Sequence, residues 1–225
     1  MSKKGGSNHL NRMAAPKYMR IGKKTSKYVA KPMVGRHTLR NSVALVTLLR
    51  ENMNLGNSAY EIKKVIKEGK IKVNGKDIKD ERYAVGLEDV VDIMPSKETY
   101  RIGVDNKGRI NAIKTDNKSQ TLKIVGKYIY KGGKSMLRLH DGSLIPAAKD
   151  AKVNDSVKLS DRKIEKVLKL EKGAQCMIIS GVHSSEQGKI TDIKKGTVGR
   201  ESTVEIEGKN GRIETVLRNI IVIGA

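Results

Sequence analysis

Residues 58–78 read SAYEIKKVIKEGKIKVNGKDI and give the clearest indication of the fold. Ser58, followed three residues later by Glu61, forms a capping box that is typical of the first turn of a helix. Apolar residues then recur at helical spacing, and Gly69 stands where a C-terminal cap is expected. Apolar and polar residues next alternate around Asn74-Gly75, the strongest short signal for a β-hairpin. The stretch therefore predicts a helix that leads directly into a hairpin.

The flanking residues extend this pattern on both sides. Apolar residues between Val43 and Met53 have helical spacing and predict a preceding helix. The segment Asp89–Ile93 predicts a strand that follows the hairpin. The order helix, helix, hairpin, strand over residues 41–98 resembles the small alpha-L RNA-binding domain, with two helices and a short β-sheet. That domain occurs in ribosomal proteins, pseudouridine synthases and some tRNA synthetases.

The leader, residues 1–40, contains 11 Lys and Arg but no Asp or Glu, which is half of the formal net charge of +22. Its apolar residues are sparse and glycine and proline interrupt them, so it cannot offset its ordering entropy by itself. A solvated disordered tail is one interpretation. We expect instead a basic extended arm that becomes ordered along phosphates, whose binding would depend steeply on salt.

Residues 99–173 predict a central all-β domain. Its expected strands are short and separated by turn residues, a pattern typical of a small barrel or sandwich. These strands are 100–104, 110–114, 120–130, 136–139, 143–145, 156–159 and 164–170.

Residues 174–225 predict five further short strands, which suggest a C-terminal SH3-like barrel. Their arrangement, with Gly181 before a loop and Gly188-Lys189 after it, resembles a KOW motif. In that motif a glycine-containing turn contacts RNA or protein, and glycine suits it because it tolerates positive φ and close approach of the backbone.

Composition limits the partners. The chain of 225 residues has 46 Lys and Arg against 24 Asp and Glu, which favours a polyanionic partner. No apolar run approaches the roughly 18 residues that a membrane span needs, and the first residues do not form a secretory signal. The single Cys176 excludes an intramolecular disulfide, so a reducing, cytoplasmic location is expected.

Several motifs resemble the "four-e" family of archaeal and eukaryotic small-subunit ribosomal proteins, along the whole chain and in the archaeal type. His9–Pro16 is similar to the opening of the family, and Gly35–Arg40 matches its entry to the first helix. Lys152–Val157 and Asn219–Gly224 are similar to its central and C-terminal strands.

The sequence also departs from the family. Asn11 replaces a basic residue, residues 144–147 replace an aromatic segment, and Ser184–Gln187 replaces the glycine-rich turn of the KOW loop. The resemblance implies an α+β multidomain protein that is a structural constituent of the small ribosomal subunit. Its expected partners are small-subunit rRNA and neighbouring ribosomal proteins, with no cofactor, membrane or small-molecule substrate.

Phosphate and shape contacts should dominate over base reading, since the chain has seven Tyr but no Phe or Trp. The expected contacts in the arm are Arg12, Lys17, Arg20, Lys23, Lys24, Arg36, His37 and Arg40. In the alpha-L unit they are Lys63, Lys64, Lys67, Lys70, Lys72 and Lys76. A solvated surface charge is the alternative for each of these lysines taken alone.

Other functions are less well supported by the sequence. An RNA-modifying enzyme could carry the alpha-L unit, but the segment after residue 98 is too short to form a pseudouridine synthase domain. A non-ribosomal translation or transcription factor could use the same modules. Cys176 lies in an apolar run and favours a structural thiol over a nucleophile, and the four histidines lack metal-ligand spacing. His140-Asp141 is better interpreted as a turn than as an acid–base pair, so we expect no enzyme activity.

Overall fold

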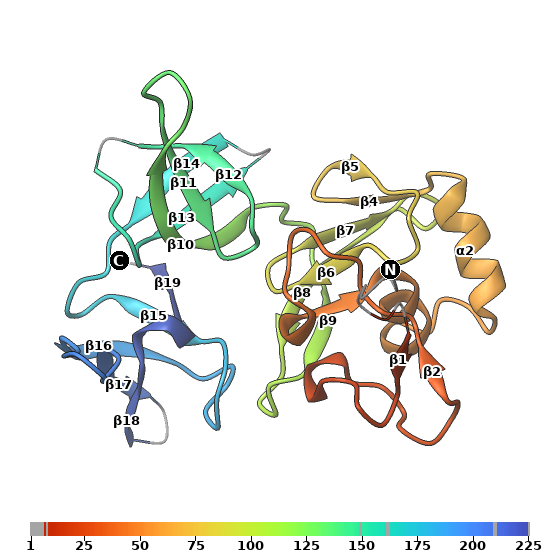
Figure 1. The fold of residues 1–225 in the computed structure, drawn as a ribbon, viewed down its shortest axis with the longest axis horizontal. Helices are drawn as coiled ribbons and strands as arrows, with labels where there is room; N and C mark the ends of the chain where they lie inside the picture. The colour runs from red at the N-terminus through yellow and green to blue at the C-terminus, as the bar shows by residue number, and fades with distance from the viewer. Residues whose placement is uncertain (1–6, 8, 149, 161–162, 209–210, 225) are drawn as a thin grey trace, which may run out of the picture. The chain divides into compact units, whose positions relative to one another are not determined.

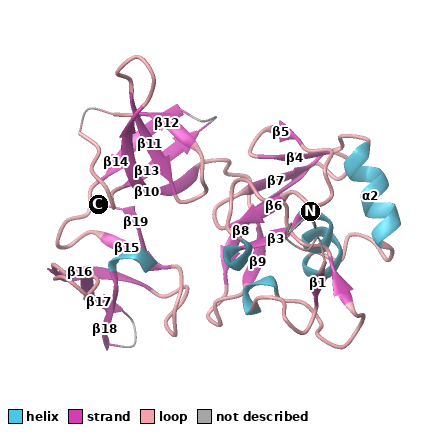
Figure 2. Cartoon of the chain, viewed as in Figure 1, coloured by secondary structure: helices cyan, strands magenta, loops and turns pink. Residues whose placement is uncertain are grey.

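The computed structural model of the chain describes residues 7, 9–148, 150–160, 163–208 and 211–224. The described chain forms two compact units. The first contains the residues up to Gly103 and Arg109–Asp116, and the second contains Val104–Gly108 and the chain from Asn117 onward. Strands are the main elements of both units, and the longest helix belongs to the first (Figures 1 and 2).

The first unit has a five-stranded sheet in the order β5-β4-β7-β8-β9 and two separate strand pairs, β1 with β2 and β3 with β6. The elements from the leader to the first helix are β1 (Leu10–Asn11), η1 (Lys17–Met19), β2 (Tyr28–Val29), η2 (Leu39–Asn41), β3 (Ser42–Ala44), α1 (Leu45–Thr47) and the π-helical turn η3 (Leu48–Asn52). They are followed by α2 (Ala59–Lys67), β4 (Ile71–Val73), β5 (Lys76–Asp77), β6 (Ala84–Gly86), β7 (Val90–Ile93), β8 (Glu98–Val104) and β9 (Ile110–Lys114).

The predicted second helix is confirmed together with its caps. The backbone N–H of Tyr60 donates to Ser58 Oγ at 3.1 Å, and that of Ser58 donates to Glu61 Oε2 at 3.3 Å, which completes the capping box. Gly69 has a φ of +74° just beyond the helix. The helix packs Ile62 and Ile66 into the core.

The predicted hairpin is also confirmed. Asn74 and Gly75 both have positive φ, 52° and 74°, as the tightest hairpin turns require. β4 pairs with β5 on one side and with β7 on the other.

The first helix is shorter than the sequence pattern predicts. Val43 lies in β3, where it pairs with Val85 of β6, and helical structure begins only at Leu45. The sequence pattern did not predict β6. Without a known strand partner, the apolar spacing from Val43 onward indicated the start of a helix. The periodicity was correct for the buried residues Leu45, Leu48 and Leu49.

The boundary predicted at residues 98/99 does not agree with the sheet. β8 pairs with β7 through Val90↔Arg101 and three further residue pairs, and β9 completes the same sheet. The change of sheet therefore comes after Lys114. Alternating strands identify themselves in a sequence, but they do not identify the sheet that they join.

The leader is also more folded than expected. Leu10, Ala15, Met19 and Val29 are buried in the core that contains the helices of the first unit. The leader could not form a core of its own, but these four apolar residues pack on the core next to it, whereas Met13, Met33 and Val34 stay exposed. The expected extended arm is therefore wrong for these residues of the leader.

The second unit consists of two five-stranded sheets. The first has the order β12-β11-β10-β13-β14, and the second has the order β18-β17-β16-β15-β19. The strands of the first sheet are β10 (Gln120–Ile129), β11 (Ser135–Leu139), β12 (Leu144–Pro146), β13 (Ser156–Ser160) and β14 (Lys163–Leu168). Those of the second are β15 (Gln175–Ile178), β16 (Gln187–Lys194), β17 (Thr203–Gly208), β18 (Gly211–Val216) and β19 (Ile220–Gly224), with the turn η4 (Leu217–Asn219) before β19.

The second unit has two clusters of buried apolar residues, one mainly in each sheet, and Leu168 of β14 belongs to the cluster of the second sheet. Two polar contacts join the sheets. The N–H of Val222 donates to Ser156 Oγ at 3.0 Å, and Lys123 Nζ donates to the carbonyl of Leu217 at 2.6 Å. The sequence predicts two domains for these segments, whereas they form one compact unit in the structure.

Candidate nucleic-acid interface

One face of α2 presents an aromatic residue and two lysines to solvent. Tyr60, Lys64 and Lys67 are spaced four and three residues apart, so they lie on one face of the helix. Ile62 and Ile66 point into the core, and Tyr60 is 77% exposed. We call Tyr60, Lys64 and Lys67 the α2 stripe. It places two cations beside an aromatic surface, which suits contact with RNA.

The six lysines predicted in the alpha-L unit fall into two groups. Lys63, Lys70 and Lys72 have carboxylate neighbours: Nζ of these lysines lies 2.8 Å from Glu81, 2.6 Å from Glu68 and 3.6 Å from Asp77. Lys64, Lys67 and Lys76 are exposed and form no ion pair with another described residue. The second group is the better candidate for phosphate contacts, since none of its lysines forms an ion pair with a described carboxylate.

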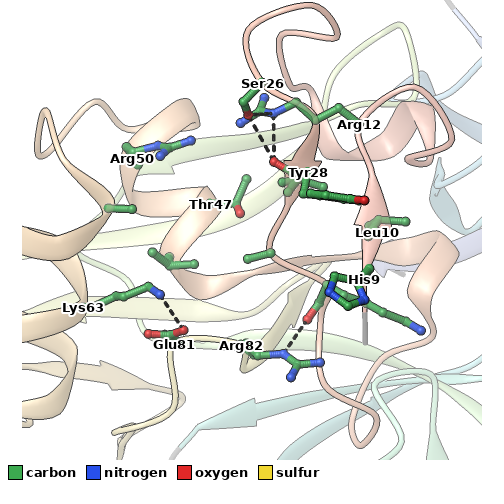
Figure 3. Close-up of a pocket in the computed structure, with 15 residues that line it drawn as sticks. His9, Leu10, Arg12, Ser26, Tyr28, Thr47, Arg50, Lys63, Glu81 and Arg82 are labelled. Carbon is green, nitrogen blue, oxygen red and sulfur yellow. Dashed lines mark hydrogen bonds and ion pairs between the residues drawn. The ribbon is translucent and has the colours of Figure 1, made fainter. Parts of the chain in front are cut away.

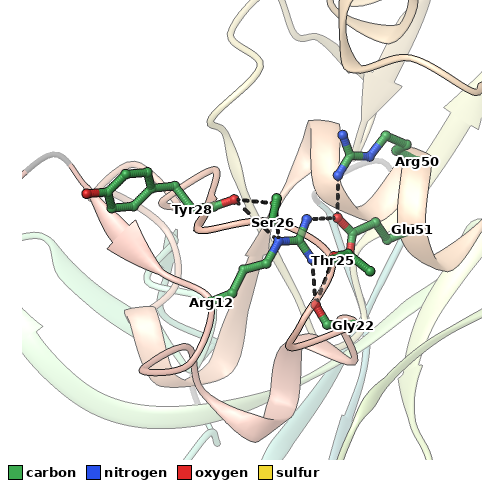
Figure 4. A network of polar contacts seen from close by, with 7 residues as sticks. All are labelled: Arg12, Gly22, Thr25, Ser26, Tyr28, Arg50 and Glu51. Atoms are coloured by element: carbon green, nitrogen blue, oxygen red, sulfur yellow. Dashed lines mark hydrogen bonds and ion pairs between the residues drawn. The ribbon is translucent and has the colours of Figure 1, made fainter.

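Arg12 does not have the role predicted for it. Its side chain is 2% exposed, and its guanidinium pairs with Glu51 (Figure 4). Nη1 also donates to the carbonyl of Gly22 at 2.9 Å, and Nε donates to Ser26 Oγ at 2.7 Å. A guanidinium that is enclosed in this way cannot reach a phosphate, so Arg12 fastens the leader to the first helix.

Glu51 accepts from two arginines, Arg12 and Arg50. Burial by itself would raise the pKa of the Glu51 carboxyl, but hydrogen bonds and attraction from the two guanidinium groups outweigh burial and lower it. Glu51 is therefore ionised at neutral pH and balances the charge that the leader brings into the core.

Lys23 is also used within the fold. Its Nζ donates to the carbonyls of Arg12 at 3.0 Å and Ala15 at 2.7 Å, so it holds the turn of the leader closed. Lys23 is therefore a weaker candidate for a phosphate contact than the sequence suggested, because its ammonium group already has these partners.

His37 and Arg36 converge on Asp89, a carboxylate with no exposed surface. His37 Nε2 lies 2.8 Å from Asp89 Oδ2, and Arg36 Nη2 lies 3.7 Å from Oδ1. Asn74 Nδ2 donates to Oδ1 at 2.7 Å and the N–H of Gly86 donates to Oδ2 at 2.9 Å. His37 was predicted to contact RNA, but it is buried here. Arg36 is directed toward this carboxylate.

The surroundings of Asp89 determine its charge. Burial would raise its pKa, but His37, then Arg36 and the N–H of Gly86, outweigh that effect and lower it. The His37 ring packs tightly against Gly86, because a Cβ on Gly86 would lie 2.5 Å from Nδ1 of His37. The network therefore fastens the end of the leader to the turn between β6 and β7.

The other four leader cations that were predicted to contact phosphate are exposed. Lys17, Lys24 and Arg40 face solvent without an ion pair to a described residue, and exposed Arg20 donates from Nη1 to Asn111 Oδ1 at 3.1 Å. These residues remain candidates for RNA contact.

A hollow of about 360 Å³ lies where the leader meets α1, η3 and α2 (Figure 3). Lys63 and Glu81 point toward each other on one side, and His9, Leu10 and Tyr28 form the other side. Arg50 and Arg82 also line the hollow, and no sequence pattern indicated these two residues. Several of its cations already have partners: Arg82 Nε donates to the carbonyl of Lys31 at 3.1 Å, and Arg50 bonds Glu51. The hollow is therefore a weaker site for an anion than the α2 stripe.

The predicted KOW loop is divided between a turn and a strand. Gly181 is exposed with a φ of +114°, as a turn glycine requires. Gly188 lies in β16, where a Cβ would come within 2.5 Å of the carbonyl oxygen of Glu207, so close strand packing explains this glycine. Lys189 is exposed and stands opposite Glu207 in the neighbouring strand.

The residues whose chemistry could suit catalysis, Cys176 and Asp141, have roles in the fold. Burial raises the pKa of the Cys176 thiol to about 11, which keeps it protonated at neutral pH. Asp141 Oδ1 accepts from the N–H and the hydroxyl of Ser143, as in a turn.

Among the described residues no group of three His, Cys, Asp or Glu could hold a metal ion. None of the described helices combines the length and the apolar character needed to cross a bilayer.

Comparisons with known proteins agree on one group of relatives. Sequence models match the RS4NT domain at residues 4–40, the S4 domain at 45–91 and the ribosomal family S4e at 96–164. The chain is 40% identical to small ribosomal subunit protein eS4 of Methanocella arvoryzae, over 96% of this chain and 94% of the relative. Identity to the protein of that name from Archaeoglobus fulgidus is 35%, over 96% and 93%.

A solved structure shows the same fold. The crystal structure of 30S ribosomal protein S4e from Thermoplasma acidophilum superimposes with a TM-score of 0.70 at 27% identity. The match covers 82% of this chain and 96% of that one.

Proposed function

The chain belongs to the family of small ribosomal subunit protein eS4, and from this membership we propose that it is a structural constituent of the small ribosomal subunit in the cytoplasm. Its partners there are rRNA and neighbouring ribosomal proteins. The role is structural and not catalytic, as expected of a ribosomal protein, and it involves no cofactor or small-molecule substrate.

The observation that carries the RNA-binding proposal is the α2 stripe. Lys64 and Lys67 are exposed cations on a rigid helix, held in place by a complete capping box and a buried opposite face. Phosphates are the natural partners of such charges, and Tyr60 offers a flat surface beside them. The stripe lies within the segment that the S4 domain model matches.

The rest of the proposed surface consists of Lys76 and four exposed leader cations, Lys17, Arg20, Lys24 and Arg40. Lys63, Lys70 and Lys72 take a smaller part, because each shares its charge with a carboxylate. We retain residues 41–98 as the centre of an alpha-L RNA-binding domain, with β8 and β9 extending its sheet.

We also propose that residues 174–225 form a KOW-type SH3-like barrel. Five consecutive antiparallel strands and the turn at Gly181 support this assignment. The exposed turn, together with Lys189, would contact rRNA or a neighbouring protein.

A salt titration tests the RNA-binding proposal. The full chain is mixed with protein-free small-subunit rRNA, and the affinity is measured from roughly 50 to 300 mM salt. The double variant Lys64→Ala/Lys67→Ala should bind more weakly, with a logarithmic salt slope that is smaller by about 1 to 2.

The matched control is Lys172→Ala/Lys194→Ala, which removes the same charge from lysines that pair with Asp192 and Glu205 in the second unit. The control should keep nearly the whole salt slope. If the wild-type chain binds the rRNA equally well at all salt concentrations, the phosphate mechanism is wrong. Equal losses in both variants would show that only total charge matters and would remove the α2 stripe from the proposal.

A further inference from the structure

The hairpin formed by β10 and β11 has a tip that is both aromatic and positively charged. Residues 127–134 read KYIYKGGK, and no Asp or Glu occurs anywhere from residue 120 to residue 140. In Figure 1 the hairpin extends beyond the other strands of its sheet. This tip belongs to the second unit and is separate from the α2 stripe.

The tip has a defined backbone. The N–H of Tyr130 donates to the carbonyl of Lys134 at 2.8 Å, and that of Gly133 donates to the carbonyl of Tyr130 at 3.2 Å. Gly132 and Gly133 have φ values of 81° and 72°, so the turn uses backbone conformations that other residues rarely adopt. The two strands thus remain paired up to the turn, which fixes the direction of the side chains before it.

A β-bulge decides which side chains face outward. Ile124 pairs with Leu139 and Gly126 pairs with Arg138, so Val125 is an extra residue in β10. Beyond the bulge Lys127 stands opposite Leu137, which is buried in the core.

Because side chains alternate along a strand, Tyr128 and Tyr130 lie on the opposite face, away from the core. The outward face also carries Arg138. Directly opposite residues share a face, and Arg138 stands opposite Gly126, two residues before Tyr128. A Cβ at Gly126 would lie 3.9 Å from Nε and Nη2 of Arg138, so the guanidinium lies over the glycine backbone. Two tyrosine rings and one guanidinium plane therefore share one face of the hairpin.

This face is open and its charge is unbalanced. Tyr128 and Tyr130 are 37% and 55% exposed. None of the cations Lys131, Lys134 and Arg138 is ion-paired with a described residue, and all three are exposed. The surface thus fits a partner that is negatively charged and has flat apolar faces. Unpaired nucleotides have both properties, since aromatic and guanidinium planes stack on their bases while cations contact their phosphates.

We propose that the outward face of the β10–β11 hairpin is a second RNA site, which binds unpaired nucleotides of rRNA. Tyr128 and Tyr130 each stack on a base, and Arg138 with the lysines of the tip contacts the adjoining phosphates. The proposal rests on the proposed function of the chain as an rRNA-binding protein and adds to it a site that binds single-stranded RNA.

The opposite face of the same hairpin offers an internal control. Ile129 is 75% exposed but lies on the other face from the tyrosines. A protein partner that buried the whole tip would use Ile129 as well as the tyrosines. An RNA that stacks on the tyrosine face would not need it.

The experiment measures the affinity of three variants of the full chain for protein-free small-subunit rRNA. Tyr128→Ser/Tyr130→Ser should bind roughly 10- to 100-fold more weakly, given the usual contribution of base stacking. Tyr128→Phe/Tyr130→Phe keeps both rings and should bind like the wild type. Ile129→Ser should also bind like the wild type.

Other results would overturn the inference. If the serine variant keeps its affinity for rRNA while the wild-type chain and its α2 stripe variants behave as proposed, the hairpin site is wrong and the proposed function remains. If the serine and Ile129 variants bind naked rRNA normally but fail to enter the assembled subunit, the tip is a protein-docking surface. If the wild-type chain does not bind the rRNA at all, the proposed function itself fails. Circular dichroism of each variant, together with the phenylalanine pair, separates loss of binding from loss of folding.

Discussion

The leader and the α2 stripe are both rich in cations. Some of the leader's cations are directed toward the interior of the protein, whereas both cations of the stripe face solvent. In the leader, Arg12 and Arg36 are directed inward, toward Glu51 and Asp89. In the stripe, Lys64 and Lys67 turn outward and meet solvent. The leader has the greater charge by sequence, but much of that charge is already engaged by the protein.

The difference lies in where the carboxylates are. A buried charge needs an opposite charge or hydrogen bonds to offset its desolvation. Glu51 is 39 residues from Arg12, and Asp89 is 52 residues from His37, so the fold itself brings the partners together. The number of cations in a segment therefore does not say how many remain available to RNA.

The largest effect is expected from breaking the buried pair. Arg12→Met keeps an unbranched, apolar stem at this position but leaves the Glu51 carboxylate with Arg50 alone and removes the bonds to Gly22 and Ser26. Loss of one partner of a buried ion pair typically costs about 3–5 kcal/mol, so we expect a destabilisation of that order in the first unit. Urea unfolding followed by hydrogen exchange of the first unit measures it.

Lys24→Met is the control, because it removes an exposed cation from the same leader. It should change the free energy of unfolding by less than about 0.5 kcal/mol. If both variants are equally stable, the leader is not fastened to the core through Arg12, and the contrast between the two regions disappears.

The sequence predicted what is encoded by neighbouring residues. The cap at Ser58 and the turn at Asn74-Gly75 depend on side chains within a few positions, and both are confirmed. The roles of Arg12 and His37 depend on distant carboxylates, and no local pattern shows those pairings.

The same reasoning explains two errors of the fold prediction. β6 is only three residues long and was not predicted, although it is the partner of β3. β8 was predicted as a strand, but its sheet was not, because its register with β7 is a tertiary property. The outward face of the β10–β11 hairpin likewise depends on a bulge that the alternation of residues does not show.

Lys123 is a third kind of cation, one that is buried without a carboxylate partner among the described residues. Lys123 in β10 is 4% exposed, and its Nζ has the carbonyl of Leu217 as a partner but no carboxylate among the described residues. Burial lowers the pKa of Lys123 to about 8 from its ordinary 10.5. Between these two values the unfolded chain binds more protons than the folded chain, so the free energy of unfolding rises with pH across that window.

We expect this rise to be on the order of 1–3 kcal/mol for the second unit. Lys123→Met should remove it, and the difference between the two unfolding curves isolates the contribution of Lys123 from that of other groups. A parallel pH dependence in both proteins from pH 8 to 10.5 would show that Lys123 has an ordinary pKa in the fold. The buried cation with a carboxylate, Arg12, would then be the only kind that matters for stability among those compared.

The smallest effect on stability is expected where the effect on RNA binding is large. In Lys64→Ala/Lys67→Ala two opposing contributions nearly cancel. The lysines stand near the C-terminal end of α2, where cations favour the helix dipole by about 0.3–1 kcal/mol each. They also repel each other at a spacing of three residues by a few tenths of a kcal/mol, and alanine is the better helix former.

Urea unfolding should therefore show a change of less than about 0.5 kcal/mol for this variant, with little dependence on salt, while its RNA affinity falls. A destabilisation as large as that of Arg12→Met would mean that the stripe is engaged within the fold like the leader. Exposed charge that costs the fold nothing to remove is charge that the fold leaves free for a partner, and this is the property that distinguishes the α2 stripe from the buried Arg12 of the leader.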